Sequence, residues 1–113
     1  MKKGDLVRFR HMLDAAKEAV EISSGKSLQD IENERLLNLS LVRLLEIIGE
    51  AANFISSDLQ TKYSKIEWSQ IIGMRNRLIH GYNNIDFDIL YQTIKKDIPP
   101  LIVELEHVVK SEK

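Results

Sequence analysis

The stretch ERLLNLSLVRLLEIIGEAANFIS, residues Glu34 to Ser56, decides the fold of this chain. Its apolar residues recur at alternating steps of four and three, which is the spacing of one face of an α-helix. Leu45 and Ala52 widen that face. We therefore expect a long helix at the centre of an all-α domain. The apolar stripe consists of Leu37, Leu41, Leu44, Ile48, Ala51 and Ile55.

The same helix carries a second, polar stripe at three- and four-residue steps, and Gly49 lies within it. A glycine inside a helix costs about 1 kcal/mol relative to alanine. Gly49 therefore indicates that another helix packs closely at this point. The polar stripe is either a solvated face or a buried row of side chains with polar partners. Its members are Arg43, Glu46, Glu50 and Asn53.

Apolar periodicity also predicts the helices on either side of this central one. A stripe from Leu6 to Val20 predicts the first helix, which Gly25 ends. Residues 27–34 and 56–67 are polar connections with a turn or two of helix. A further helix is predicted over residues 68–80, where Gly81 ends it, and GYNNID at 81–86 is predicted to be a loop.

Two aspartates mark the starts of the last predicted helices. Asp86 is expected to cap a helix over residues 87–96. Asp97 is expected to cap another, in which Pro99 and Pro100 occupy the first turn, where proline is tolerated. Short linkers favour antiparallel neighbours. The whole chain, residues 1–113, is therefore predicted to form a single domain: a four-to-five-helix antiparallel bundle.

Composition narrows the classes of function. The chain has 113 residues, of which 43% are hydrophobic, and it contains no cysteine, so neither a disulfide framework nor a thiolate metal site is possible. No apolar run reaches the roughly 18 residues of a membrane helix, and we expect a cytoplasmic, soluble protein. The net charge is −1. Because nucleic-acid-binding domains are usually basic, any contact with RNA should be local or built by more than one chain.

The segment MRNRLIHGY, residues 74–82, concentrates side chains that a core does not need. Arg75 offers a planar set of donors that matches phosphate oxygens, and His80 can take or give a proton near neutral pH. Asn76 adds an amide and Tyr82 a hydroxyl. These groups suit metal-free cleavage of a phosphodiester, in which a base activates the RNA 2′-hydroxyl, an acid protonates the leaving oxygen and a cation holds the developing charge.

Each of these residues also has a structural interpretation. Arg75 could extend along the surface from a helix end, and His80 could cap a helix C-terminus. Asn76 could bond a neighbouring helix, and Tyr82 could close the edge of the core. Arg75 and His80 would lie roughly 140° apart around an ideal helix, so both reach one ligand only if His80 lies at a released helix end.

One chain offers one histidine near Arg75, whereas the reaction needs both a base and an acid. His11 and His107 lie near opposite ends of the sequence. A symmetric dimer would bring a second Arg75 and a second His80 to the same cleft and would concentrate positive charge there. We therefore expect a composite site on a two-fold axis, with Glu46 or Glu50 orienting Arg75 or His80. No Glu-x-x-His motif accompanies these glutamates, so no metal or other cofactor is expected.

Four tracts in order carry a resemblance over nearly the whole chain. They are LEIIGEAAN at 45–53, WSQIIGMRN at 68–76, IHGY at 79–82 and DIPPL at 97–101. Together with the Arg-x4-His spacing, they resemble the HEPN superfamily and, more closely, its HepT-like branch, which contains the toxins of type VII-like HepT–MntA toxin–antitoxin pairs. The motif shows no departure from the family pattern.

The resemblance implies an all-helical homodimer that acts as a metal-independent endoribonuclease. It implies that Arg75 and His80 are the catalytic pair and that Asn76 supports them. It also implies a partner, an MntA-like nucleotidyltransferase antitoxin, which transfers AMP from ATP to the motif tyrosine, here Tyr82. The alternative is a non-catalytic helical adaptor or regulatory subunit that binds a minimal nucleotidyltransferase; the near-neutral charge favours it, and the intact motif favours the nuclease.

Overall fold

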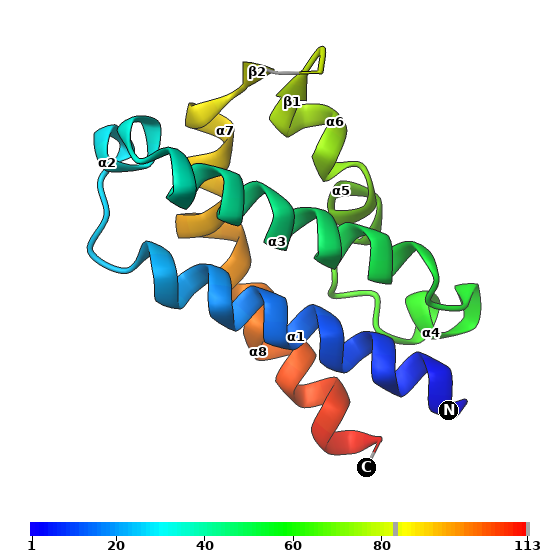
Figure 1. Ribbon diagram of the computed structural model, residues 1–113. Helices are drawn as coiled ribbons and strands as arrows, with labels where there is room; N and C mark the ends of the chain where they lie inside the picture. The colour runs from blue at the N-terminus through cyan, green and yellow to red at the C-terminus, as the bar shows by residue number, and fades with distance from the viewer. Residues whose placement is uncertain (83, 113) are drawn as a thin grey trace.

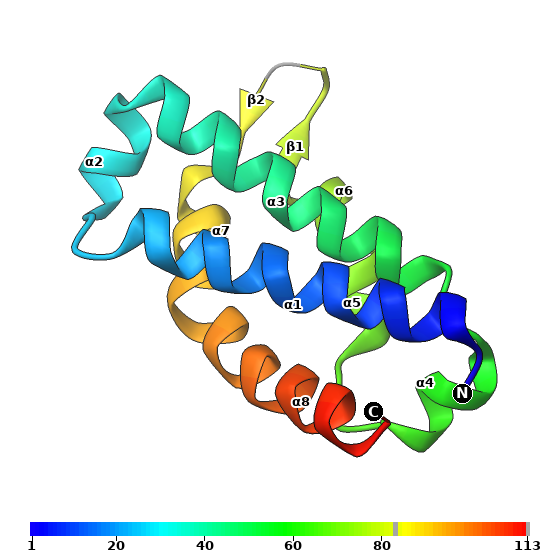
Figure 2. The ribbon, with the colours of Figure 1, turned by 60° about the horizontal axis from the view of Figure 1, so that its bottom comes forward.

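The computed structural model describes residues 1–82 and 84–112, and it confirms an all-α fold. Two long helices, α1 and α3, run side by side in opposite directions, and α8 packs on the other side of α1 (Figures 1 and 2). Among the described residues, no helix is both long enough and apolar enough to cross a membrane. The helices and strands are α1 (Lys3–Ser23), α2 (Leu28–Asn33), α3 (Arg35–Asn53), α4 (Ser57–Lys62), α5 (Trp68–Ile72), α6 (Met74–Leu78), β1 (Ile79–His80), β2 (Asn84–Ile85), α7 (Phe87–Gln92), the π-helix η1 (Thr93–Asp97) and α8 (Ile98–Ser111).

Helix α3 is the central helix that the apolar stripe predicts. Leu41, Leu45 and Ile48 are fully buried, and α3 contacts α1, α2, α5 and α6. The core continues into α1 through Phe9, whose ring packs edge-on against Trp68 at 5.9 Å between centroids. Gly25 follows α1 with a φ of +73°. A left-handed residue at this position is the usual end of a helix, as predicted.

Gly49 is the point of closest approach between α3 and α5. A Cβ added there would lie 2.8 Å from the backbone carbonyl oxygen of Ile71, which is closer than two such atoms can approach. The prediction that another helix packs against Gly49 is confirmed. The contact holds the end of α5 against α3, and α6 follows directly after Gly73.

The predicted single helix over residues 68–80 is wrong in two respects. First, Gly73 divides it into α5 and α6, because its ψ of 2° departs from the helical value of about −42°. Second, α6 ends at Leu78, since Ile79 is extended and pairs with Ile85 in an antiparallel β-ladder. The predicted loop at 81–86 is therefore partly a hairpin; Asn83 lies outside the described residues.

The end of the chain forms one continuous helical path. Asp86 caps α7 as predicted, because its side chain accepts a hydrogen bond from the Ile89 backbone N–H. The predicted cap at Asp97 is wrong: this residue is itself helical and makes no cap hydrogen bond. Pro99 and Pro100 have no N–H to bond the carbonyls of residues 95 and 96, and their rings would collide with those carbonyls in an α-helix. The wider turn of the π-helix η1 avoids these collisions, and the chain continues into α8 without leaving the helical path.

The Gly49 contact generates a stability prediction. We expect Gly49→Ala to lower the free energy of unfolding by up to about 2 kcal/mol, because overpacking costs about 1–3 kcal/mol and helix propensity returns about 1 kcal/mol of it. Gly4→Ala is the matched control, since a Cβ at that helical glycine makes only an ordinary contact at 3.5 Å. Urea unfolding measures both; equal stabilisation by the two substitutions would contradict the close approach.

Candidate functional site

The predicted site residues lie along α6 and the hairpin that follows it. Arg75 and Asn76 are on α6, and His80 is in β1. Tyr82 lies in the turn between β1 and β2. The hairpin projects from one end of the molecule, opposite the end where α1 begins and α8 ends (Figures 1 and 2). Helix α6 ends at Leu78, before His80. The separation of roughly 140° between Arg75 and His80 in an ideal α-helix therefore does not apply.

Arg75 is paired with Glu46 across the α3–α6 interface. The Nε–H of Arg75 donates a hydrogen bond to Glu46 Oε2 over 2.8 Å, and the Arg75 side chain is 62% exposed whereas that of Glu46 is 19% exposed. An ion pair this accessible stabilises a protein by about 0–1 kcal/mol. Its main effect is therefore on orientation. The carboxylate holds the Nε edge of the guanidinium, and the other edges make no hydrogen bond or ion pair with the described residues.

Glu50 makes a different contact from Glu46. Its Oε1 accepts a hydrogen bond from Arg43 Nη1 at 3.3 Å, and both side chains are largely exposed. The solvated-face interpretation of the polar stripe therefore fits Arg43 and Glu50, and the structure brings only Glu46 to Arg75. All the same, Glu50 and Arg75 both line a shallow groove of about 190 Å³ between α3 and α5–α6.

His80 lies beside Asp86, which the hairpin carries back to it. The His80 Nε2 is 3.5 Å from Asp86 Oδ2, and the other carboxylate oxygen of Asp86 accepts the Ile89 N–H. The Asp86 backbone N–H donates to the Leu78 carbonyl over 2.7 Å, which fixes the start of α7 against the end of α6. The Ile89 N–H, and after it the His80 ring, hold the pKa of the Asp86 carboxyl below its usual value.

Asn76 and Tyr82 contradict their structural interpretations. The Tyr82 side chain is 99% exposed, so it does not close the edge of the core. Asn76 is exposed as well, and no hydrogen bond joins its side chain to a neighbouring helix within the described residues. His80 is not a helix cap either, since the residue that follows α6 is Ile79. All four motif side chains thus face solvent.

Sequence reasoning assigned Asp86 only the role of a helix cap and missed its contact with His80. The missed signal is the GYNN segment at 81–84, because glycine and asparagine together are typical of hairpin turns. A hairpin centred there pairs Ile79 with Ile85 and so brings Asp86 back beside the end of α6. Recognising the turn would have placed this carboxylate near the histidine.

The arrangement offers a guanidinium and an imidazole, each beside one carboxylate. A carboxylate next to a histidine fixes the orientation of its ring. The guanidinium supplies a fixed positive charge for an anionic ligand. Within residues 1–82 and 84–112, no three histidine, aspartate or glutamate side chains lie close enough to share a metal ion.

The lowered pKa of Asp86 generates a pH prediction. A carboxyl whose pKa is depressed on folding adds stability above the unfolded pKa, here about 3.8, and loses it as the pH falls through the lower, folded value. Asp86→Asn should therefore lower the Tm at pH 7, and the difference from wild type should shrink below pH 4. Thermal unfolding at pH 7, 4 and 2.5 measures this; Asp14→Asn, at an exposed carboxylate on α1, is the control. A constant difference at all three pH values would refute the role of the charge.

Comparison with known proteins agrees with the motif. The family model described as "Ribonuclease HepT-like" matches residues 12–108. "Putative RNase MJ1380" of Methanocaldococcus jannaschii is 33% identical over 96% of this chain and all of its own length. "Putative RNase TTE0752" of Caldanaerobacter subterraneus subsp. tengcongensis is 36% identical over 93% of this chain and 94% of its own. "Probable ribonuclease HepT" of Thermococcus cleftensis is 30% identical over 97% of this chain and all of its own length. No solved structure matches the chain significantly. The chain therefore belongs to the HepT-like family of the HEPN superfamily.

Proposed function

We propose that this protein is a metal-independent endoribonuclease that acts as the toxin of a HepT–MntA type pair. The observation that carries the proposal is the placement of the family's Arg-x4-His pair. Arg75 and His80 are both exposed, and each lies beside its own carboxylate, Glu46 and Asp86. Family membership and relatives named as RNases support the same reaction class.

The reaction needs no group outside the RNA and the protein. The 2′-hydroxyl oxygen attacks the adjacent phosphorus and loses its proton to a base, while the bond from phosphorus to the 5′-oxygen breaks and that oxygen takes a proton from an acid. The products are a 2′,3′-cyclic phosphate and a 5′-hydroxyl. His80 would exchange these protons, and Arg75 would hold the additional negative charge on the phosphoryl oxygens. Asn76 would support the same phosphate.

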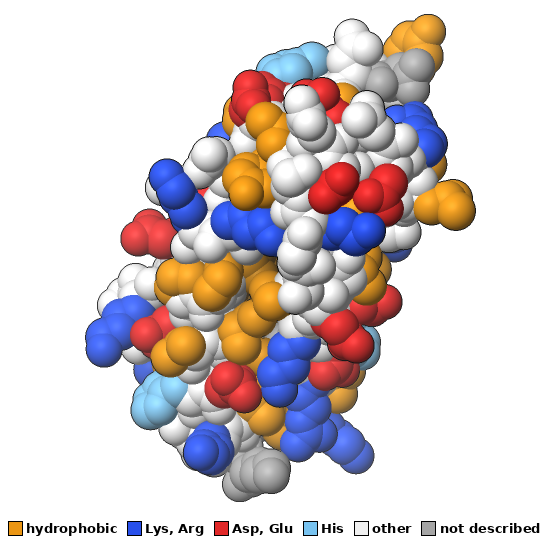
Figure 3. All heavy atoms as spheres, turned by 90° about the vertical axis from the view of Figure 1, so that its left-hand side faces the viewer, with side chains coloured by type: hydrophobic (Ala, Val, Ile, Leu, Met, Phe, Trp, Pro, Cys, Tyr) orange, Lys and Arg blue, Asp and Glu red, His pale blue; other side chains and the backbone are white. Residues whose placement is uncertain are grey.

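Two copies of the chain would supply what one lacks. A single chain places one histidine in this region, so the second proton-transfer group would be the His80 of a second copy across a two-fold axis. Charge points the same way: Figure 3 shows acidic and basic side chains interspersed on one face rather than a broad basic surface, and the net charge is −1. Two Arg75 guanidinium groups in a shared cleft would provide the local positive charge that phosphate binding needs.

Tyr82 would be the site of neutralisation. Its hydroxyl oxygen would attack the α-phosphorus of ATP, lose its proton and release pyrophosphate, which leaves AMP joined to Tyr82 through a phosphodiester. An MntA-like nucleotidyltransferase would catalyse this step. Full exposure at the hairpin turn makes the hydroxyl accessible to another enzyme. The attached nucleotide would place a negative charge and a bulky group two residues from His80, which would exclude RNA.

A second candidate is a non-catalytic helical adaptor for a nucleotidyltransferase. The observation that favours it is electrostatic: Glu46 already neutralises Arg75 at 2.8 Å, and the chain as a whole is slightly acidic. In that case Arg75 and His80 would serve recognition of the partner, and purified protein would leave RNA intact.

The two candidates differ in one assay. Purified wild-type protein is expected to cleave single-stranded RNA in EDTA and to leave cyclic phosphate ends, whereas His80→Ala should reduce cleavage at least about a hundredfold, because general acid–base groups contribute roughly 10²–10⁴. His107→Ala, which removes the exposed histidine of α8, is the control and should cleave normally. Absence of cleavage, or equal loss in both variants, would favour the adaptor.

The same assay tests the neutralisation step. Protein produced together with a nucleotidyltransferase should carry AMP on Tyr82, detected by mass spectrometry of the tyrosine peptide, and should no longer cleave RNA. Tyr82→Phe should stay unmodified and active in the same cells. Modification at another residue, or modified protein that still cleaves, would contradict the role of Tyr82.

A further inference from the structure

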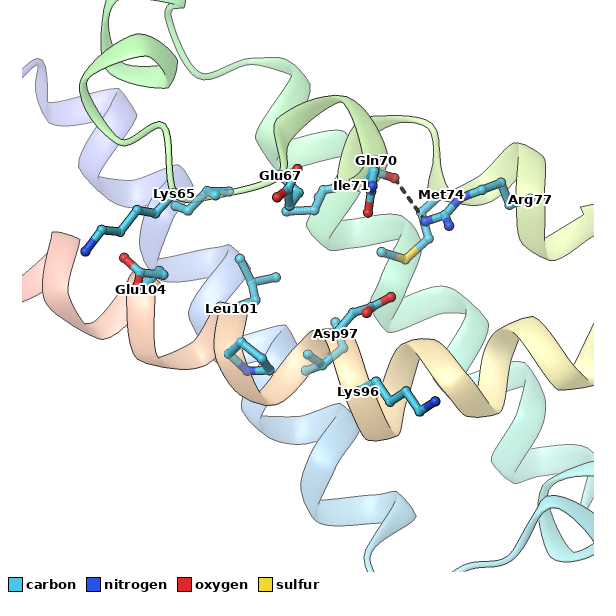
Figure 4. Close-up of a pocket in the computed structure, with 13 residues that line it drawn as sticks. Lys65, Glu67, Gln70, Ile71, Met74, Arg77, Lys96, Asp97, Leu101 and Glu104 are labelled. Carbon is cyan, nitrogen blue, oxygen red and sulfur yellow. Dashed lines mark hydrogen bonds between the residues drawn. The ribbon is translucent and has the colours of Figure 1, made fainter.

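A second recess lies on the far side of α5–α6 from Glu46, where these helices diverge from η1 and the start of α8. It has a volume of about 300 Å³. Its floor is apolar, formed by the buried side chains of Ile71, Met74 and Leu101. Figure 4 shows the Met74 and Leu101 side chains pointing into the gap from opposite walls. A recess of this volume with an apolar floor has room for a planar ring.

The rim of this recess is charged but balanced. Lys65 and Glu104 lie at one end, whereas Arg77 and Lys96 lie at the other (Figure 4). Three basic and three acidic residues line it in all, with Glu67 and Asp97 completing the acidic set. Such a rim is close to neutral, so it offers no net charge for binding, and recognition would depend on the base and on one phosphate. It suits a ligand that combines a neutral ring with a single phosphate.

Asp97 and Arg77 supply the two polar contacts that such a ligand requires. The Asp97 carboxylate points into the gap toward Met74 (Figure 4), and the π-turn of η1 is what brings this residue to the rim. The Arg77 guanidinium makes one long hydrogen bond, 3.4 Å from Nη2 to the Gln70 carbonyl oxygen, and no ion pair within the described chain. An acceptor thus faces the recess, and a donor with spare N–H groups stands at its end.

We propose that this recess binds a guanine nucleotide, presented by the single-stranded RNA substrate a few nucleotides from the cleaved bond. Guanine offers the ring N–H and the exocyclic amino group side by side, and one carboxylate accepts both. Uracil instead presents an N–H between two carbonyl oxygens, which the carboxylate repels. The sulfur of Met74 favours contact with an aromatic ring, and Arg77 holds the phosphate of the same nucleotide.

The outer surface of α6 connects this recess with the cleavage site. Arg75, Asn76 and Arg77 are consecutive and all exposed. Arg75 turns toward α3 and Arg77 toward the recess. A strand that crosses α6 would therefore meet one guanidinium on each side of the helix. The RNA source of the guanine rests on the proposed function, whereas binding of the nucleotide itself does not.

Nucleotide binding is tested without any cleavage. GMP, AMP, CMP and UMP are titrated into the ¹⁵N-labelled full chain, and amide shifts are followed by NMR. GMP should shift residues of α5, α6 and η1 and bind about tenfold more tightly than UMP, as expected for loss of a two-point contact. Asp97→Asn should remove most of that difference, and Arg77→Ala should weaken all four nucleotides. Asp88→Asn and Arg10→Ala, which lie outside the recess, should leave the affinities unchanged. No binding up to millimolar GMP, or shifts confined to Arg75 and His80, would overturn the proposal.

The source of the guanine is tested on RNA. Cleavage products of a random-sequence RNA should show enrichment of guanine at one fixed position offset from the cut, and the products of Asp97→Asn should lack that enrichment. GMP binding without positional enrichment would overturn the RNA assignment. Absence of all cleavage together with intact GMP binding would contradict the nuclease function, and so the RNA assignment, but leave the guanine site standing.

Discussion

The close approach of α3 and α5 at Gly49 is the constraint on which the rest of the structure depends. With no side chain at this position, the Ile71 carbonyl comes within a distance that any Cβ would forbid. The position of α5 then sets that of α6, because only Gly73 separates them. Arg75 consequently reaches Glu46 on α3. A backbone contact at one glycine therefore controls where the guanidinium of the candidate site lies.

Periodicity predicted the helices that bury a continuous stripe, and it failed where the chain changes direction without losing its apolar pattern. The long helices α1 and α3 were predictable because burial repeats along their whole length. The break at Gly73 was not, because Ile71, Met74 and Leu78 are buried on both sides of it and the pattern continues through the break. Similarly, the π-helix at Thr93–Asp97 is a consequence of the Pro99–Pro100 pair. The spacing of apolar residues contains no signal for it.

The candidate site was predictable as a set of residues but not as a set of contacts. The spacing of Arg75 and His80, and the likeness of four tracts to one family, predicted which side chains to propose for the site. Which carboxylate meets each of them depends on tertiary geometry. Glu46 rather than Glu50 reaches Arg75, although both lie on one stripe of α3. Asp86 reaches His80 only because a two-residue ladder folds the chain back.

A composite site shared by two copies is the central claim, and a mixed dimer tests it most directly. Dimers are purified that contain one wild-type chain and one chain with both Arg75→Ala and His80→Ala, each chain carrying a different affinity tag, and RNA cleavage is measured per dimer. If both copies act on one phosphodiester, the mixed dimer should have about 1% of wild-type activity or less, because each missing acid–base group costs roughly 10²–10⁴. Half of the wild-type activity would show two independent sites and contradict the account.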